Sequence, residues 1–337
     1  MRCIERASWH RALVPLGSAV LLACGGGAPD ATEPRVRVLI PPGSSFSAAS
    51  DSLASQGLVG WPFAFRTYAK LRGLDREIKA GEYRFARGAS WQSMLRALNA
   101  GQSVRGRVTI PEGFALRDIV PLLTRSLGAP AESLEVAVRD TALLGQLTIP
   151  TPTLEGYLFP DTYHFPYGIS ARLAVREMVR RFESMWDSDW DARLTELGMS
   201  RHQIVALASI IEKEARLESE RPVISAVYHN RLRRGMPLQA DPTVQYALGR
   251  HRERVTYRDL QVRSPYNTYR NRGLPPGPIA SPGRASIEAA LYPANVPYLY
   301  FVAHPDGHHE FRTTFREHTK AREEVRKAAA SKAGGNK

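Results

Sequence analysis

The stretch Ile204-Val-Ala-Leu-Ala-Ser-Ile-Ile-Glu-Lys-Glu-Ala215 joins an apolar helical face to two carboxylates. Its apolar residues, among them Leu207 and Ile211, recur every three or four positions, which predicts a helix with one face in a core. Glu212 and Glu214 fall on opposite flanks of that face. A glutamate at the edge of an apolar surface loses hydration, so its pKa rises, which suits a general acid. A helix that simply becomes charged near its C-terminus has the same pattern, and periodicity does not choose between the two glutamates.

The segment after this helix, from Tyr228 to Gly283, is rich in proline and glycine. These residues fix backbone dihedrals and exclude long regular elements, so we expect rigid loops. The loops present tyrosine, asparagine, glutamine and aspartate, which suit a sugar or peptide ligand that needs stacking faces and many hydrogen bonds. A proline-rich surface without a ligand has the same composition, so composition alone leaves both interpretations open.

Six short blocks occur in an order shared with a known enzyme family. They are Leu154-Glu-Gly-Tyr-Leu-Phe-Pro-Asp-Thr-Tyr163, Ala208-Ser-Ile-Ile-Glu-Lys-Glu214, Asn230-Arg-Leu232, Gln239-Ala-Asp-Pro-Thr-Val244, Tyr266-Asn-Thr-Tyr269 and Gly273-Leu-Pro-Pro-Gly277. Together they resemble the endolytic murein transglycosylases, bacterial lytic transglycosylases that cut nascent peptidoglycan glycan strands. The resemblance runs from about Val36 to Lys320.

The resemblance implies cleavage of the β-1,4 bond between N-acetylmuramic acid and N-acetylglucosamine without water. Ordinary glycosidases usually pair two carboxylates. Lytic transglycosylases need one glutamate, which protonates the glycosidic oxygen and then acts as base while the substrate's own 6-hydroxyl attacks the anomeric carbon. The tethered hydroxyl has a high effective concentration, and the product carries a 1,6-anhydro end. The second glutamate of the Glu-Lys-Glu block matches the family's catalytic position, which assigns Glu214 as catalytic and leaves Glu212 a structural or supporting role.

The same resemblance implies a set of residues that bind the glycan. They are Glu155, Tyr157, Asp161, Glu212, Gln239, Asp241, Tyr266 and Asn267. Glu155 and Asp161 either bind sugar or cap turns, and both alternatives stay open. Tyr157 and Tyr269 either stack on sugar rings or belong to the core.

A weak internal repeat begins the part of the chain expected to fold. A strand at Val36–Ile40, a Pro-Pro-Gly turn and a helix at Ser47–Gln56 are followed by a strand at Val108–Ile110, a Pro-Glu-Gly turn and a helix at Leu116–Leu127. The first copy resembles a LysM-like peptidoglycan-binding module, as the family would have. A Pro-x-Gly turn between a strand and a helix is common, so the repeat by itself has low specificity.

The expected fold class is α+β. A LysM-like module at 36–105 and a second strand–helix module at 106–150 precede a mostly helical catalytic domain at 151–320, and a basic tail occupies 321–337. The catalytic domain should contain long proline- and glycine-rich loops and a β-hairpin around Asp306-Gly307, a turn-forming pair.

The N-terminus is typical of an exported protein. Three arginines precede an apolar segment at 12–23, which is shorter than the ~20 residues of a spanning helix and has the length of a signal-peptide core. It ends in Leu21-Leu-Ala-Cys-Gly25, which resembles a bacterial lipobox with Cys24 as the lipidated residue. Members of the family more usually carry a transmembrane helix, so an uncleaved anchor is the alternative. We expect 1–24 to be a signal peptide or anchor and 25–35 a flexible linker.

The net charge of +13 predicts attraction to a polyanion. No RNA- or DNA-binding motif accompanies the charge, so nucleic acid is not an expected partner. The expected partners are peptidoglycan glycan strands, the membrane through the N-terminal anchor and, by resemblance, peptidoglycan synthases. The resemblance also implies anchoring in the inner membrane with the catalytic domain in the periplasm.

No metal, cofactor or disulfide is expected. The two cysteines, Cys3 and Cys24, precede the folded region. Metal-ligand residue types cluster in the expected hairpin, namely His304, His308, His309 and Glu310. The Asp-Gly turn among them breaks any helix, so the helical spacing of metal ligands does not apply, and we expect solvent-facing histidines.

Two other classes of function fit the same sequence. One is a peptidoglycan-binding scaffold without catalysis, in which Glu214 is an ordinary flank residue. The other is a hydrolase in which Asp241 activates water for Glu214. Products with anhydro ends, products with reducing ends, or the absence of cleavage separate the three classes.

Overall fold

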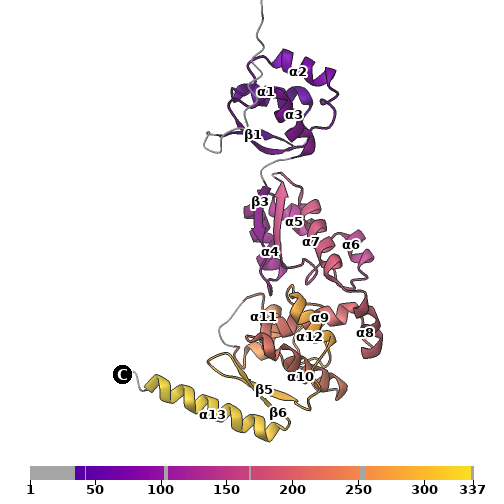
Figure 1. Ribbon diagram of the computed structural model, residues 1–337. Helices are drawn as coiled ribbons and strands as arrows, with labels where there is room; N and C mark the ends of the chain where they lie inside the picture. Colours follow the sequence, from indigo (N-terminus) through magenta and orange to yellow (C-terminus); the bar gives the residue numbers. More distant parts are fainter. Residues whose placement is uncertain (1–34, 42, 102–104, 167, 251–254, 335–337) are drawn as a thin grey trace, which may run out of the picture.

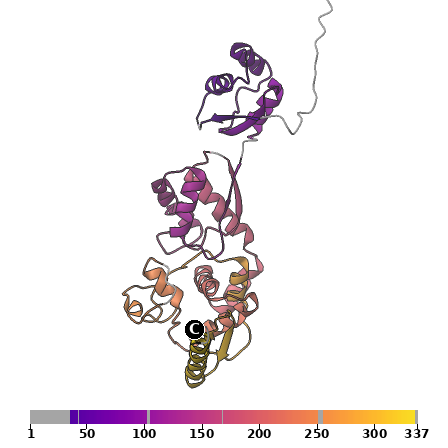
Figure 2. The same ribbon diagram turned by 90° about the vertical axis from the view of Figure 1, so that its left-hand side faces the viewer.

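The chain folds into three parts that follow one another along an elongated molecule (Figures 1 and 2). The computed structural model describes residues 35–41, 43–101, 105–166, 168–250 and 255–334. Helices alternate with three small antiparallel two-stranded sheets, so the expected α+β class is confirmed.

The N-terminal part has a hydrophobic core of its own. It consists of β1 (Arg35–Ile40), α1 (Phe46–Ser55), α2 (Pro62–Leu71), β2 (Gly81–Ala86) and α3 (Trp91–Ala100). β1 and β2 pair antiparallel with Val38 opposite Tyr83. Leu53, Phe65 and Leu98 are fully buried beneath them. The expected first strand and first helix are therefore present, the helix beginning just after the Ser45 hydroxyl, which accepts a hydrogen bond from a first-turn amide.

The middle part contains the second sheet. It consists of β3 (Arg105–Thr109), α4 (Leu116–Leu127), α5 (Ala131–Ala137), α6 (Thr141–Gln146), β4 (Thr162–Pro166) and α7 (Ala171–Met185). β3 and β4 pair antiparallel, and α5 packs on α7. The structure thus differs from the expected division at residue 150, because β4 completes this sheet from within 151–320. The residues of β4 alternate between exposed and buried, but a strand of only five residues carries little signal in the sequence.

The internal repeat extends to individual contacts. Tyr83 lies opposite Val38, and its hydroxyl donates to the carbonyl of the residue four positions earlier at 2.6 Å. Tyr163 lies opposite Val108, and its hydroxyl donates to the carbonyl four positions earlier at 2.5 Å. Each tyrosine also stacks on the phenylalanine two residues later. The two modules therefore share one pattern of strand pairing and tyrosine anchoring.

The C-terminal part is mainly helical and carries the hairpin. Its elements are α8 (Asp189–Leu197), α9 (Arg201–Glu214), the 3-10 turn η1 (Glu218–Glu220), α10 (Arg221–Arg233), α11 (Asp241–Ala247), the 3-10 turn η2 (Asp259–Gln261), α12 (Arg284–Leu291), β5 (Tyr300–Ala303), β6 (His309–Arg312) and α13 (Phe315–Gly334). α9 packs against α12 and α10, and one core cluster joins it to the middle part. The expected hairpin is confirmed.

The end of the chain differs from expectation. Residues 321–334, expected as part of a basic tail, continue α13, which packs on both strands of the hairpin. Within the part of the chain that the structure describes, no helix is both long and apolar enough to cross a membrane. The expected anchor at 1–24, including Cys24, lies outside the described residues.

Candidate active site

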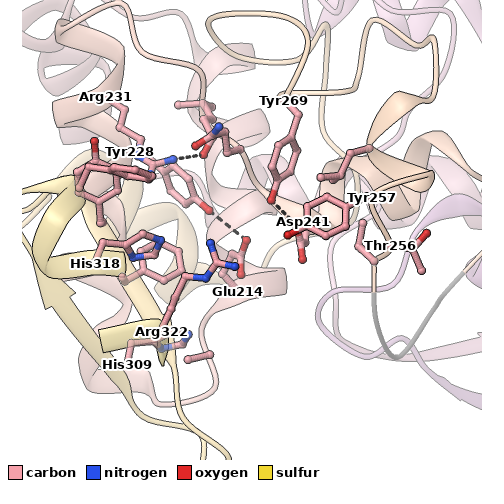
Figure 3. Close-up of a pocket in the computed structure, with 18 residues that line it drawn as sticks. Glu214, Tyr228, Arg231, Asp241, Thr256, Tyr257, Tyr269, His309, His318 and Arg322 are labelled. Atoms are coloured by element: carbon pink, nitrogen blue, oxygen red, sulfur yellow. Dashed lines mark hydrogen bonds between the residues drawn. The ribbon is translucent and has the colours of Figure 1, made fainter. Parts of the chain in front are cut away.

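An open cleft of about 740 Å³ lies at the C-terminal end of α9 (Figure 3). Its walls come from segments far apart in sequence: the end of α9, α10, the loop before α11, the segment around η2, the hairpin and α13. Among its lining residues are Glu214, Tyr228, Arg231, Gln239, Asp241, Tyr257, Tyr269, His309, His318 and Arg322. A long polymer can enter such a site from the side, because the cleft is open.

Glu214 is the last residue of α9 and stands half-buried in the wall of the cleft. Residues 204–211 of the helix are all buried, which fixes its position. The Tyr228 hydroxyl donates a hydrogen bond to Oε1 of Glu214 at 3.1 Å. Desolvation, helped by the charge of Asp241, raises the pKa of Glu214 to about 7, against the opposing effects of Tyr228 and Arg231. Near neutral pH this carboxyl group can therefore both hold and release a proton.

Asp241 and Tyr269 form a second hydrogen-bonded pair in the cleft (Figure 3). The Tyr269 hydroxyl donates to Oδ1 of Asp241 at 2.5 Å. Burial, first, and then the bond to Asp241 raise the pKa of Tyr269, so it remains a neutral donor. The pair places a carboxylate and an aromatic ring on one wall of the cleft.

The loop that leads into α11 is held in a strained conformation. Gln239 is exposed to the cleft with φ of 52°, a left-handed conformation that residues other than glycine rarely adopt. The backbone amide of Gln239 donates to the carbonyl of Thr268 at 3.2 Å. The fully buried Asn267 donates to the carbonyls of Leu260 and Val262, both at 2.9 Å. Asn267, expected to line the groove, instead fixes the loops that form it.

Arg231 braces two walls of the cleft. Its guanidinium donates to the carbonyls of Leu238 and Leu299, both at 2.7 Å. It also lies 5.1 Å from the centre of the Tyr300 ring. These contacts connect α10 to the loop before Gln239 and to the hairpin, so the positions of both depend on one buried side chain.

The hairpin contributes a buried histidine. Nδ1 of His309 lies 2.7 Å from Oε2 of Glu220, and the backbone amide of His309 donates to Oε1 of Glu220 at 2.9 Å. The expectation that the hairpin histidines face solvent is wrong for His309, which is 7% exposed. The reason is a partner 89 positions earlier in the chain, which local sequence cannot reveal.

The other two hairpin histidines pair with nearby carboxylates. Nε2 of His304 lies 3.1 Å from Glu310, and Nδ1 of His308 lies 2.6 Å from Asp306. Among the residues that the structure describes, no group of three or more histidine, cysteine, aspartate and glutamate side chains is arranged so that it could hold a metal ion.

Further cleft residues come from segments that carry no motif. Tyr257 is 84% exposed while lining the cleft, so its ring is free to meet a ligand. In α13, His318 stacks on Tyr300 at 5.2 Å and Arg322 lines the cleft. An exposed tyrosine and a basic helix are common in sequences, so only the fold assigns them to this site.

Glu212 turns away from the cleft. One oxygen of its carboxylate accepts the amide of Gly283 at 3.0 Å, and the other lies 3.8 Å from Arg221. Its side chain is 8% exposed. The contacts tie the end of α9 to the start of α12, as a structural role requires.

Glu155 and Tyr157 lie inside the protein rather than in the cleft. Glu155 accepts the amide of Leu116 at 3.0 Å and the hydroxyl of Tyr246 at 3.2 Å. Burial raises its pKa to about 7. Of the two alternatives for Glu155, the structure supports the capping role, because the Glu155 carboxylate accepts the first backbone amide of α4. Tyr157 is fully buried, with its hydroxyl 2.9 Å from Nδ1 of His202, so it is a core residue.

Asp161 and Tyr266 also lie apart from the residues that line the cleft. Asp161 accepts the amide of Thr162 at 2.7 Å and a bond from Arg181 at 2.6 Å. The Tyr266 ring lies 4.8 Å from that of Tyr246. Of the expected glycan-binding residues, the cleft therefore contains Gln239 and Asp241 beside Glu214.

A carboxyl group with a pKa near neutrality, set in an open cleft with tyrosine-bearing walls, is suited to acid–base cleavage of a long polar polymer. Comparison with known proteins gives the family. The profile of the YceG-like family matches residues 38–324, and the chain belongs to this family.

Two relatives are named endolytic murein transglycosylases. That of Bacillus subtilis (strain 168) is 35% identical over 304 residues, which cover 86% of this chain and 84% of the relative. That of Streptococcus pneumoniae serotype 2 (strain D39) is 30% identical over 299 residues, which cover 80% of this chain and 54% of the relative. The chain thus spans about half the length of the pneumococcal protein.

A solved structure has the same fold. The crystal structure of a yceG-like protein from Listeria monocytogenes is 35% identical and superimposes with a TM-score of 0.60. The match covers 85% of this chain and 98% of the Listeria chain.

Proposed function

We propose that this chain is an endolytic murein transglycosylase, a lyase that acts on peptidoglycan. The family and the names of its relatives support this activity. The observation that carries the mechanism is the position of Glu214. It combines a pKa of about 7 with access to an open cleft, at the second glutamate of the Glu-Lys-Glu block.

Glu214 acts first as an acid. In its protonated form it donates a proton to the glycosidic oxygen between N-acetylmuramic acid and N-acetylglucosamine, and the bond from the anomeric carbon to that oxygen breaks. Because the pKa is about 7, the proton is present at the pH of a bacterial envelope. The buried helix behind it and the bond from Tyr228 keep the carboxyl group in place.

Glu214 then acts as a base. Its carboxylate removes the proton of the 6-hydroxyl of the same muramic acid, and that oxygen forms a new bond to the anomeric carbon. The enzyme regains its proton, no water is consumed, and the glycan ends in a 1,6-anhydro sugar. Intramolecular attack has a high effective concentration, so a second carboxylate is not required as nucleophile.

The cleft offers groups that bind sugar beside the reacting bond. Tyr257 and Tyr269 provide aromatic faces, and Gln239 and Asp241 provide hydrogen-bonding groups. The bond between Tyr269 and Asp241 keeps this carboxylate turned toward the cleft wall. The transition state gains positive charge on the sugar ring, which a nearby carboxylate stabilises.

The location belongs to the same proposal. The N-terminus anchors the protein through a lipid on Cys24, or through an uncleaved helix, at the inner membrane, and the catalytic part faces the periplasm beside peptidoglycan synthases. Residues 36–105 form a LysM-like module that holds glycan strands. The separate core of this module supports an independent binding role.

Analysis of the products from purified glycan strands tests the activity. We expect mass spectrometry to find fragments with 1,6-anhydro ends, each 18 Da lighter than the hydrolysis product because no water is added. Reducing ends would identify a hydrolase that uses Asp241 to activate water. Binding without any cleavage would identify a scaffold, and either result contradicts the proposal.

A further inference from the structure

Helix α2 exposes three large apolar side chains. Trp61 just before the helix is 77% exposed, Phe63 in its first turn 81%, and Leu71 at its end 82%. The opposite face is packed, since Phe65 and Ala69 are fully buried. Single exposed apolar residues are ordinary, whereas two on one short helix with a third directly before it form a patch of the kind that marks an interaction site.

The helical spacing places Phe63 and Leu71 on the same face of α2, and Trp61 directly precedes the helix. Phe63, Thr67, Lys70 and Leu71 follow one another at intervals of four, three and one residues, which is one face of a helix. Lys70 in α2 and Arg72 just after it accompany the apolar groups, while Arg66 of the same helix pairs with Asp51 of α1, and α2 itself contains no acidic residue. The apolar stem of a lysine extends such a surface while its ammonium group stays in water.

The position of α2 also restricts its partner. In both views α2 belongs to the part of the molecule that lies farthest from the C-terminal part with the cleft (Figures 1 and 2). β1 begins 11 residues after Cys24. An extended chain of that length reaches at most about 40 Å. If Cys24 carries a lipid, as proposed above, this module cannot move farther than that from the bilayer.

We propose that the face of α2 with Phe63, Lys70 and Leu71, together with Trp61 and Arg72 at the two ends of the helix, docks on an anionic phospholipid surface. Tryptophan and phenylalanine enter the boundary between headgroups and acyl chains, and lysine and arginine pair with the anionic headgroups. The docked module would hold the molecule at one end and leave the cleft at the other end, away from the bilayer.

A glycan strand is the other candidate partner, and it fits less well. Sugar-binding surfaces combine aromatic faces with several hydrogen-bonding groups. This face adds an aliphatic leucine and two cations, with Thr67 as its uncharged polar group. Apolar side chains flanked by cations are instead the composition of helices that lie on membranes.

Fluorescence of the full chain reconstituted in vesicles tests the docking. The contribution of Trp61 is the difference between the wild type and a Trp61→Tyr variant. We expect brominated acyl chains to quench this contribution in vesicles rich in phosphatidylglycerol, and much less in vesicles of phosphatidylcholine alone. Phe63→Ser with Leu71→Ser should lower the docked fraction at least about tenfold, and Lys70→Gln and Arg72→Gln about fivefold each.

A matched control replaces apolar residues that are exposed elsewhere. Val136 and Leu173 of the middle part are 73% and 55% exposed, and their serine variants should keep the quenching. All these variants should cleave short soluble glycans normally, which separates a failure of docking from a failure of the proposed activity. Absence of Trp61 quenching in anionic vesicles, or quenching that survives the Phe63 and Leu71 changes, overturns the proposal. Protection of Trp61 from acrylamide by glycan strands without lipid would assign the face to glycan instead.

Discussion

At the scale of single residues, the proton affinity of Glu214 results from neighbours that act in opposite directions. Desolvation and the charge of Asp241 raise its pKa, while the Tyr228 hydroxyl and the Arg231 charge lower it. The balance at about 7 allows one group to serve as acid and then as base. Each neighbour can be removed separately, so the balance is open to direct measurement.

Replacing Asp241 by asparagine removes the like charge beside Glu214. The pKa of Glu214 should fall, so the alkaline limb of the rate–pH profile, which reports loss of the catalytic proton, should move to lower pH. Measuring kcat/KM between pH 5 and 9 on soluble glycans checks this shift. Tyr228→Phe should have the opposite effect, because it removes a hydrogen bond that stabilises the Glu214 carboxylate. The pKa of Glu214 should rise, and the alkaline limb of the rate–pH profile should move to higher pH. Shifts in the same direction would contradict the account.

At the scale of elements, the sequence predicted the helices and turns whose signal lies within a short local stretch. The buried helix ending at Glu214 was predictable from apolar spacing, and the hairpin from its Asp-Gly turn. β4 was not, because its partner β3 lies more than 50 residues earlier in the chain. Asn267 and His309 were misjudged for the same reason, since burial by distant segments decides whether a polar side chain binds a ligand or holds a loop.

The contact between the Glu155–Gly156–Tyr157 turn and the loop at Pro278 joins the middle part to the C-terminal part. Gly156 has φ of +84°, and a Cβ there would lie 2.4 Å from Cβ of Pro278. We expect Gly156→Ala to lower the free energy of unfolding by more than about 2 kcal/mol, from strain and steric overlap together. Urea denaturation measures the change.

Gly198→Ala is the control for this prediction. Gly198 has φ of +63° and nothing within 4 Å of the added Cβ. Its variant therefore experiences the backbone strain alone, about 1 kcal/mol. Equal destabilisation of the two variants would mean that the contact with Pro278 does not hold the two parts together.

At the scale of the whole molecule, the N-terminal part is separate from the part that carries the cleft. The N-terminal part has its own core, whereas the middle and C-terminal parts share one. The internal repeat predicted separate modules at 36–105 and 106–150. The core that joins the middle part to the C-terminal part was not predicted, because a shared core depends on contacts between segments far apart in the chain. The anchor remains a prediction from Cys24 and the apolar segment before it.

Cys24→Ala tests the lipid anchor in cells. If Cys24 is lipidated, the variant should accumulate as an unprocessed precursor and lose labelling by a radioactive fatty acid. Unchanged size and labelling would contradict lipidation and favour an uncleaved N-terminal helix. The catalytic rate on soluble glycans should not change, because residues 1–34 precede the part that carries the cleft.

We propose that Glu214, rather than Glu212, transfers the proton. The decisive measurement is the yield of anhydro products from Glu214→Gln and Glu212→Gln, made with thermal melts of both. Glutamine keeps the shape but has no proton to transfer, so Glu214→Gln should bind glycan strands, remain folded and lose ~10²–10⁴-fold in rate. Glu212→Gln weakens the contacts with Gly283 and Arg221, so it should lower the melting temperature and lose activity only in proportion to unfolding. An active Glu214→Gln beside a folded but inactive Glu212→Gln would contradict the account.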